Sequence, residues 1–161
     1  MEDRLLELLK ERSFARRPVV LASGRESDFF IDCKQTVLLG EGHALAGAAL
    51  FERLGAFEPA PVAVAGVELG GCPLASAVAL TAHRRGRPLD AVYVRKATKD
   101  HGSQRRLEGD AHLASGAPVA VVEDVVTTGG STLRAVETLR AAGHDVVGVL
   151  ALVDRREGGA E

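Results

Sequence analysis

The chain has 161 residues, of which 46% are hydrophobic and 26% are charged, so it is long enough for one domain with a sizeable apolar core. Aromatic residues make up only 4% and tryptophan is absent, which argues against a stacking surface for single-stranded nucleic acid. The formal net charge of −2 supplies no basic field that would attract nucleic acid or an acidic membrane.

The same composition bears on compartment and membrane association. The opening segment, MEDRLLELLKER, is charged throughout and lacks the apolar stretch of a signal peptide. No segment of the sequence is long and apolar enough to span a membrane. Cys33 and Cys72 lie far apart and form no metal-ligand spacing, so we expect two reduced thiols in a cytoplasmic protein.

Hydrophobic periodicity predicts an alternation of helices and strands. In chain order we expect a helix at 2–12, two short strands around a Ser-Gly-Arg turn within 18–34, and a helix at 43–54. A buried strand with a glycine-rich loop follows at 61–71, then a helix at 73–85 and a strand at 90–96. Residues 98–108 are polar and indicate a mobile loop. A strand at 117–125, a helix at 130–142 and a strand at 145–155 complete the pattern, and the tail 156–161 is expected to fray.

This alternation predicts an α/β fold with a mostly parallel sheet covered by helices on both faces. In such sheets ligands bind beyond the carboxyl ends of the strands. The segments that fall at predicted strand ends are 66–71, 95–102, 123–131 and 154–155. We therefore expect a functional site where these segments meet.

The most informative segment is VVEDVVTTGGST, at 121–132. The strand delivers Glu123 and Asp124 to the sheet edge, and the loop after it offers hydroxyls and helix-start N–H groups that favour a phosphate. Carboxylates beside a phosphate-binding loop are expected where the ligand also carries hydroxyl groups, as a ribose does, or is bound together with a hydrated metal ion. The loop lacks the lysine of a Walker motif and the G-x-G-x-x-G of a dinucleotide fingerprint. The alternative is a solvated strand end followed by a simple glycine turn.

The other strand ends are less specific. The segment RKATKDHGSQRR gathers cations that could close over an anionic substrate, although an ordinary solvated loop has the same composition. Gly66, Gly70 and Gly71 allow close approach of a ligand, or serve a plain strand-to-helix turn. Arg155 follows the last strand, where a lone arginine is either a surface charge or a partner for a planar anion.

Taken together, these motifs resemble those of the type I phosphoribosyltransferases. VVEDVVTTGGST resembles that family's motif for 5-phosphoribosyl 1-diphosphate (PRPP), and ASGRESDFFID, VRKATKDHG and LVDRREGG resemble segments of its orotate phosphoribosyltransferase branch. The resemblance runs from about residue 20 to residue 159. It implies one phosphoribosyltransferase domain over 1–161, with a small N-terminal hood segment at about 1–38 and a core at about 39–156.

Carried over position by position, the resemblance implies a role for each matched residue. Glu123 and Asp124 would bind the ribose hydroxyls of PRPP. The 5-phosphate would be wrapped by Val125, Val126, Thr127, Thr128, Gly129, Gly130 and Ser131. The diphosphate would be contacted by Arg95, Lys96, Lys99 and His101. Thr127 and Arg155 would contact orotate, and the expected catalytic residues are Lys99, His101 and Asp124.

The implied reaction is orotate plus PRPP giving orotidine 5′-monophosphate and diphosphate, a step of pyrimidine (UMP) synthesis. Mg²⁺ would be the cofactor, held mainly by PRPP and water rather than by protein ligands. The resemblance also implies a homodimer, in which the loop 97–109 reaches the neighbouring site.

The residues leave two alternatives open. One is a phosphoribosyltransferase for another nucleobase, because many family members carry a lysine where this chain has Ala22 and an aromatic–lysine pair where it has Leu69 and Gly70. The other is a PRPP-sensing regulator without catalysis. Such a regulator would be expected to lose the loop cations, yet Lys99 and His101 are present.

Overall fold

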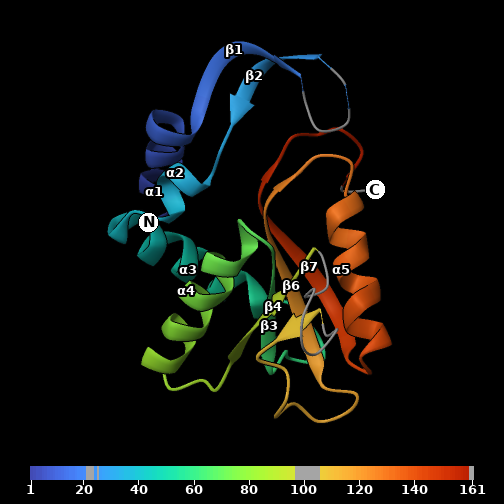
Figure 1. Cartoon of the computed structure of the whole chain (residues 1–161). Coiled ribbons are helices and arrows are strands. Elements are labelled where there is room, and N and C mark those ends of the chain that lie inside the picture. Colours follow the sequence, from blue (N-terminus) through green and yellow to red (C-terminus); the bar gives the residue numbers. More distant parts are fainter. Residues whose placement is uncertain (21–23, 25, 97–105, 160–161) are drawn as a thin grey trace.

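The structure, a computed structural model, describes residues 1–20, 24, 26–96 and 106–159, and Figure 1 draws their arrangement. The predicted site residues Lys99 and His101, and Ala22, lie outside the described residues. Among the helices in the described ranges, none has both the length and the apolar character needed to cross a membrane.

The N-terminal part is a helix followed by a two-stranded hairpin. Helix α1 (Glu2–Leu8) buries Leu5 and Leu8 and continues into a π-helical turn, η1 (Leu9–Ser13). The antiparallel strands β1 (Phe14–Val20) and β2 (Glu26–Ile31) come next, as expected, and are followed by a short helix, α2 (Lys34–Val37). Helix α2 was not predicted, because four residues are too few to show a helical period.

The core is a five-stranded sheet in the order β5-β4-β3-β6-β7. Its members are β3 (Ala63–Val67), β4 (Asp90–Val94), β5 (Leu107–Glu108), β6 (Pro118–Val126) and β7 (Asp145–Asp154). The pairs β3–β4, β3–β6 and β6–β7 are parallel, which confirms the predicted mostly parallel sheet.

Strand β5 corrects one expectation. The loop predicted over 98–108 ends in two strand residues, since Leu107 and Glu108 pair antiparallel with Val94 and Tyr93 of β4. The Leu107 side chain is buried in the core, which accounts for the pairing. A strand of two residues shows no alternation in the sequence, so the polar composition around it concealed it.

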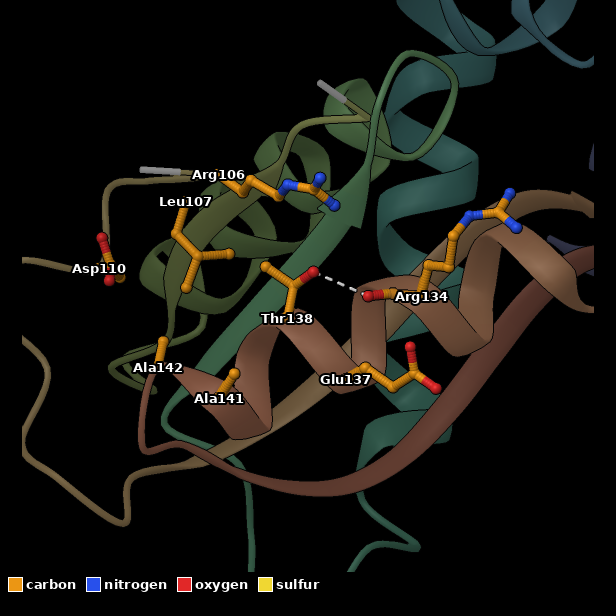
Figure 2. Close-up of a pocket in the computed structure, with 8 residues that line it drawn as sticks. All are labelled: Arg106, Leu107, Asp110, Arg134, Glu137, Thr138, Ala141 and Ala142. Carbon is orange, nitrogen blue, oxygen red and sulfur yellow. Dashed lines mark hydrogen bonds between the residues drawn. The ribbon is translucent and has the colours of Figure 1, made fainter. Parts of the chain in front are cut away.

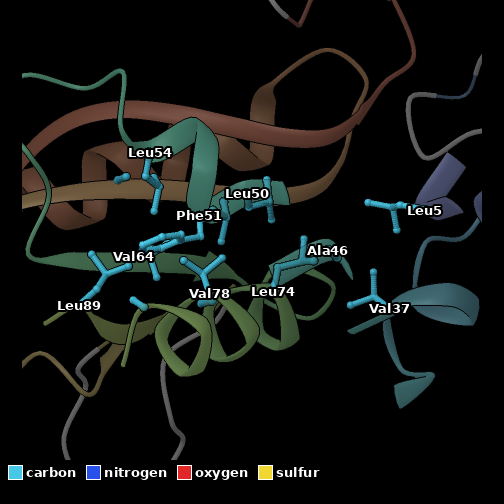
Figure 3. Packing of buried hydrophobic residues seen from close by; sticks show 14 of the residues in the cluster. Leu5, Val37, Ala46, Leu50, Phe51, Leu54, Val64, Leu74, Val78 and Leu89 are labelled. Carbon is cyan, nitrogen blue, oxygen red and sulfur yellow. The ribbon is translucent and has the colours of Figure 1, made fainter. Parts of the chain in front are cut away.

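Helices cover both faces of the sheet, as predicted (Figure 1). Helices α3 (Gly40–Leu54) and α4 (Gly71–Arg84) pack on one face, and α5 (Gly130–Ala141) packs on the other. Figure 3 shows the larger apolar cluster, in which Leu50, Leu54 and Leu74 of the helices meet Val64 of β3. The second cluster joins Ala135 and Leu139 of α5 to the opposite face of the strands. Burial on both faces explains why the central strands are almost continuously apolar.

Candidate active site

The predicted strand-end segments meet at one edge of the sheet. Strands β3, β4, β6 and β7 run parallel, so their carboxyl ends lie on the same side (Figure 1). The segments that follow them are the glycine loop at 68–71, the cationic pair at 95–96, the phosphate loop at 127–131 and the Asp154–Arg155 corner. The four segments that the sequence put at strand ends therefore lie at one edge of the sheet, as expected.

Glu123 points into the protein. It is only 4% exposed, and its Oε2 accepts hydrogen bonds from the hydroxyls of Ser131 at 3.3 Å and Thr132 at 3.4 Å. The backbone N–H of Asp124 donates to its Oε1 at 3.4 Å. Burial, and then the neighbouring charge of Asp124, raise the pKa of Glu123 to about 8. Burial therefore favours the protonated form of this carboxyl, which braces the first turn of α5.

Asp124 faces the opposite side of β6, because side chains alternate along a strand. Its carboxylate lies directly against Gly70 of the glycine loop: a Cβ built on Gly70 would stand 2.0 Å from Oδ2. From the hood segment, the Cys33 thiol donates to the Asp124 backbone carbonyl, with Sγ 3.7 Å from the oxygen. Asp124 is thus the half-buried acid of the pair, and its carboxylate position depends on a glycine at 70.

The phosphate loop begins where β6 ends. Val125 and Val126, which the sequence grouped with the loop, still pair with β7, and Val126 is buried. Gly129 has a φ of +78°, a left-handed conformation suited to glycine, and α5 begins at Gly130. No side chain of the described residues caps this helix start, so its N–H groups can bind an anion.

The end of the described chain packs on this loop. A Cβ at Gly159 would meet Val126 Cγ1 at 2.4 Å and Thr127 O at 2.5 Å, so the backbone at 159 lies tightly against both residues. The expectation that the tail frays was therefore wrong up to Gly159. The small glycine permits a close approach that no hydrophobic pattern would reveal.

The cationic pair is tied to its neighbours. The Arg95 N–H donates to Arg106 O at 2.8 Å, and Arg95 Nη1 lies 3.3 Å from Glu108 Oε1. The Lys96 N–H donates to Glu68 Oε2 at 2.9 Å, which links the cations to the glycine loop. That loop contains a cis peptide bond between Glu68 and Leu69.

Arg155 is a structural link as well as a candidate ligand. Its guanidinium donates to Ser27 Oγ at 2.9 Å and to Glu157 Oε1 at 2.8 Å, and lies 4.1 Å from the ring centroid of Phe29. Its side chain is only 3% exposed, which excludes a simple surface charge. Sequence reasoning missed Ser27 and Phe29, although both stand in the SDFF run beside the Ser-Gly-Arg turn.

Metal ligands are sparse at this edge. Within the described parts of the chain, no group of three or more His, Cys, Asp or Glu side chains is arranged to hold a metal ion. Asp124 is a half-buried carboxylate at this edge of the sheet, and oxygen ligands of this kind suit Mg²⁺. A magnesium ion here would take most of its ligands from substrate and water.

Comparison with known proteins agrees with this geometry. Residues 40–161 match the family described as the phosphoribosyl transferase domain. An orotate phosphoribosyltransferase of Sorangium cellulosum is 70% identical over 159 residues, covering 99% of this chain and 82% of that protein.

Solved structures with a similar fold also include orotate phosphoribosyltransferases. Mycobacterium tuberculosis orotate phosphoribosyltransferase in complex with Fe(III) dicitrate superposes with a TM-score of 0.80 at 40% identity, covering 98% of this chain and 86% of that one. The same enzyme in complex with PRPP gives a TM-score of 0.77 at 37% identity, covering 98% and 85%. The chain belongs to the phosphoribosyl transferase family and, within it, to the orotate phosphoribosyltransferases.

Proposed function

We infer that this chain transfers the 5-phosphoribosyl group from PRPP to orotate, giving orotidine 5′-monophosphate and diphosphate in pyrimidine synthesis. The observation that carries this inference is the meeting of the Asp124 carboxylate with the glycine loop, at the same edge of the sheet from which the uncapped helix α5 begins. Together these elements offer one ligand a carboxylate for its hydroxyls and N–H groups for its phosphate. The 70% identical relative named for this activity supports the choice of orotate.

The proposed chemistry needs no protein nucleophile. A ring nitrogen of orotate attacks the anomeric carbon as diphosphate leaves, through an oxocarbenium-like transition state. Asp124 would hold the ribose hydroxyls, while the N–H groups of Gly130 and Ser131 would hold the 5-phosphate. Arg95 and Lys96 would neutralise the leaving diphosphate. Lys99 and His101 remain proposed partners of the same group.

For orotate, the proposal rests on the Arg155 corner. The Arg155 guanidinium is planar and is held between Ser27 and the Phe29 ring, so its direction is fixed before a ligand arrives. The Arg155 N–H donates to Val126 O at 3.0 Å, which brings this corner next to Thr127. A carboxylate-bearing planar base suits this arrangement.

Magnesium is the proposed cofactor, bound with PRPP. When bound, it would neutralise charge on the diphosphate and favour its departure. Asp124, whose carboxylate lies against the glycine loop, would meet it directly or through water. We also propose a cytoplasmic location, in keeping with two free buried thiols.

A decrease in orotate absorbance tests the main inference. The full chain is mixed with PRPP, Mg²⁺ and orotate, and we expect orotate to be consumed with release of diphosphate. Consumption of another nucleobase in place of orotate would instead support a different base specificity. Binding of PRPP without turnover of any base would support the regulator.

The homodimer and the reach of the loop 97–109 can be tested by complementation. Asp124→Asn would disable a subunit's own site, whereas Lys99→Ala would disable the neighbouring site. Mixing the two inactive variants should restore activity, because one site of the mixed dimer then has both residues intact. A mixture as inactive as its components would place Lys99 in its own subunit's site or outside catalysis.

A further inference from the structure

Glu157 lies beside the guanidinium of Arg155, just beyond the end of β7. Its Oε1 accepts a hydrogen bond from Arg155 Nε at 2.8 Å. Both side chains are shielded from water, since Arg155 exposes 3% of its side chain and Glu157 exposes 16%. A hydrogen bond between two charged groups is shorter and stronger than one between neutral groups, and water competes for it less where the groups are shielded. Glu157 is therefore in a position to control the direction of the arginine.

The other sides of the Arg155 guanidinium are also engaged, except one. Its Nη2 donates to Ser27 Oγ at 2.9 Å, and its central carbon lies over the Phe29 ring. Within the described residues, its Nη1 donates to no acceptor. Because Glu157 holds the Nε side, Nη1 is the group left to meet an anionic ligand.

The turn between Arg155 and Glu157 has an unusual backbone conformation. Arg156 has a φ of +55°, in the left-handed region that residues other than glycine rarely adopt. Its N–H donates to Asp154 Oδ1 at 2.8 Å and so holds this conformation. Such a conformation persists only where the surrounding contacts fix it. Here it turns the chain back, which brings the Glu157 carboxylate onto the Arg155 side chain.

The same segment continues onto the phosphate loop. A Cβ at Gly159 would stand 2.9 Å from Gly129 N, so the backbone two residues after Glu157 packs against this loop. Glu157 thus lies between two parts of the candidate site, the Arg155 corner and the phosphate loop. A role at each part predicts different kinetics, because the first part concerns the base and the second concerns PRPP.

We propose that Glu157 is a positioning residue for Arg155, which holds the guanidinium in the direction in which Nη1 meets the carboxylate of the base. The proposal rests on the proposed function, since it takes orotate as the ligand of Arg155. A guanidinium that is held in place beforehand loses little conformational freedom when orotate arrives. Without Glu157, the base would have to immobilise this side chain itself, which would weaken its binding about 2- to 12-fold.

Steady-state kinetics of matched variants test this role. Glu157→Met keeps the length of the side chain but removes the acceptor, and Glu157→Ala removes both. Each should raise the KM for orotate about 2- to 12-fold, with kcat and the KM for PRPP changed less than about 2-fold. Glu157→Gln keeps an acceptor for Arg155 Nε and loses only the charge, so it should restore most of the affinity that the methionine variant loses. Thermal unfolding of each variant shows whether it is folded.

Glu137→Gln is the matched control, because it removes the same charge at another place on the protein. Glu137 is exposed and lines a groove along α5 together with Arg134 and Thr138 (Figure 2). In the described part of the chain, this groove shares no residue with the Arg155 corner. The control should therefore have the same KM for orotate as the unmodified chain.

In an Arg155→Lys background, Glu157→Met should add little to the KM for orotate, because the group that it positions is absent. An unchanged KM for orotate in both Glu157→Met and Glu157→Ala would overturn the proposal. So would a parallel rise in the KM for PRPP, which would assign Glu157 to the phosphate loop. A lower KM for orotate would also overturn it, because the charge at 157 would then repel the base.

The unmodified chain separates this proposal from the proposed function. If it consumes no orotate, the proposed function fails, and the role of Glu157 fails with it. If it consumes orotate and the variants differ from expectation, only the role of Glu157 fails.

Discussion

Replacing Gly70 with alanine should displace the acid that we assign to the ribose. The added Cβ would stand 2.0 Å from Asp124 Oδ2 and 2.5 Å from Oδ1. An ordinary carbon–oxygen contact needs about 3.3 Å or more, so the carboxylate must move by roughly 1 Å. It is the end of a short side chain and can rotate away, so the free energy of unfolding should change little.

The expected effect falls on PRPP binding. A carboxylate shifted by this amount loses hydrogen bonds to the ribose hydroxyls, each worth about 1.5–3 kcal/mol when one partner is charged. That loss corresponds to a roughly 10- to 150-fold weaker affinity for PRPP. Gly71→Ala should behave differently, because its Cβ would meet the backbone oxygen of Val122 at 2.6 Å and would disturb the fold itself.

Calorimetry with PRPP measures the effect, alongside thermal unfolding of each variant. Gly40→Ala is the control, since nothing lies within 4 Å of a Cβ at that position. In an Asp124→Ala background, Gly70→Ala should have almost no further effect on PRPP affinity, because the displaced group is gone. Unchanged PRPP affinity in the single variant, or an equal loss in both backgrounds, would refute the assignment.

Further predictions concern the remaining site residues. With the folded-state pKa of Glu123 raised to about 8, the folded chain holds this proton more tightly than the unfolded chain. Its stability should therefore fall as pH rises from about 4.5 to 8, by up to about 1.4 kcal/mol per pH unit. In the Glu123→Gln variant, the free energy of unfolding measured with urea should lose this pH dependence. An unchanged pH dependence would mean that other groups cause it. Lys99→Ala should lower kcat much more than it raises the KM for PRPP, and unchanged kinetics would remove this residue from the mechanism. Arg155→Lys should raise the KM for orotate more than the KM for PRPP, since a lysine loses the planar fork; equal increases would argue against a contact with orotate.

The edge of the sheet and its four segments could be predicted from the sequence, because each signal is local. The apolar run into Glu123 and Asp124 and the glycine–hydroxyl loop after it lie within one short segment, and β6 and α5 form close to where the periodicity put them. The period-2 alternation of β6 also separates the two acids onto opposite faces, although the sequence was interpreted as presenting both to one ligand.

The contacts between distant segments could not be predicted. Arg155 bonds to Ser27, 128 residues away, and nothing at either position signals the other. Asp124 and Gly70 meet only because β3 and β6 are neighbours in the sheet. Strand β5 and helix α2 are too short to show a period, and are held by burial of residues such as Leu107 and Val37.

The reactivity of the Cys33 thiol reports whether the N-terminal segment is packed on the core of the protein. The thiol is completely buried, and burial together with the charge of Asp124 raises its pKa to about 12, so the reactive thiolate is scarce while Cys33 stays packed against β6, at the junction of this segment with the core. An alkylating reagent can reach it only in molecules where that junction has opened. The rate of alkylation at Cys33 therefore measures how often this junction opens. A ligand that binds Asp124 should keep the junction closed and slow the alkylation.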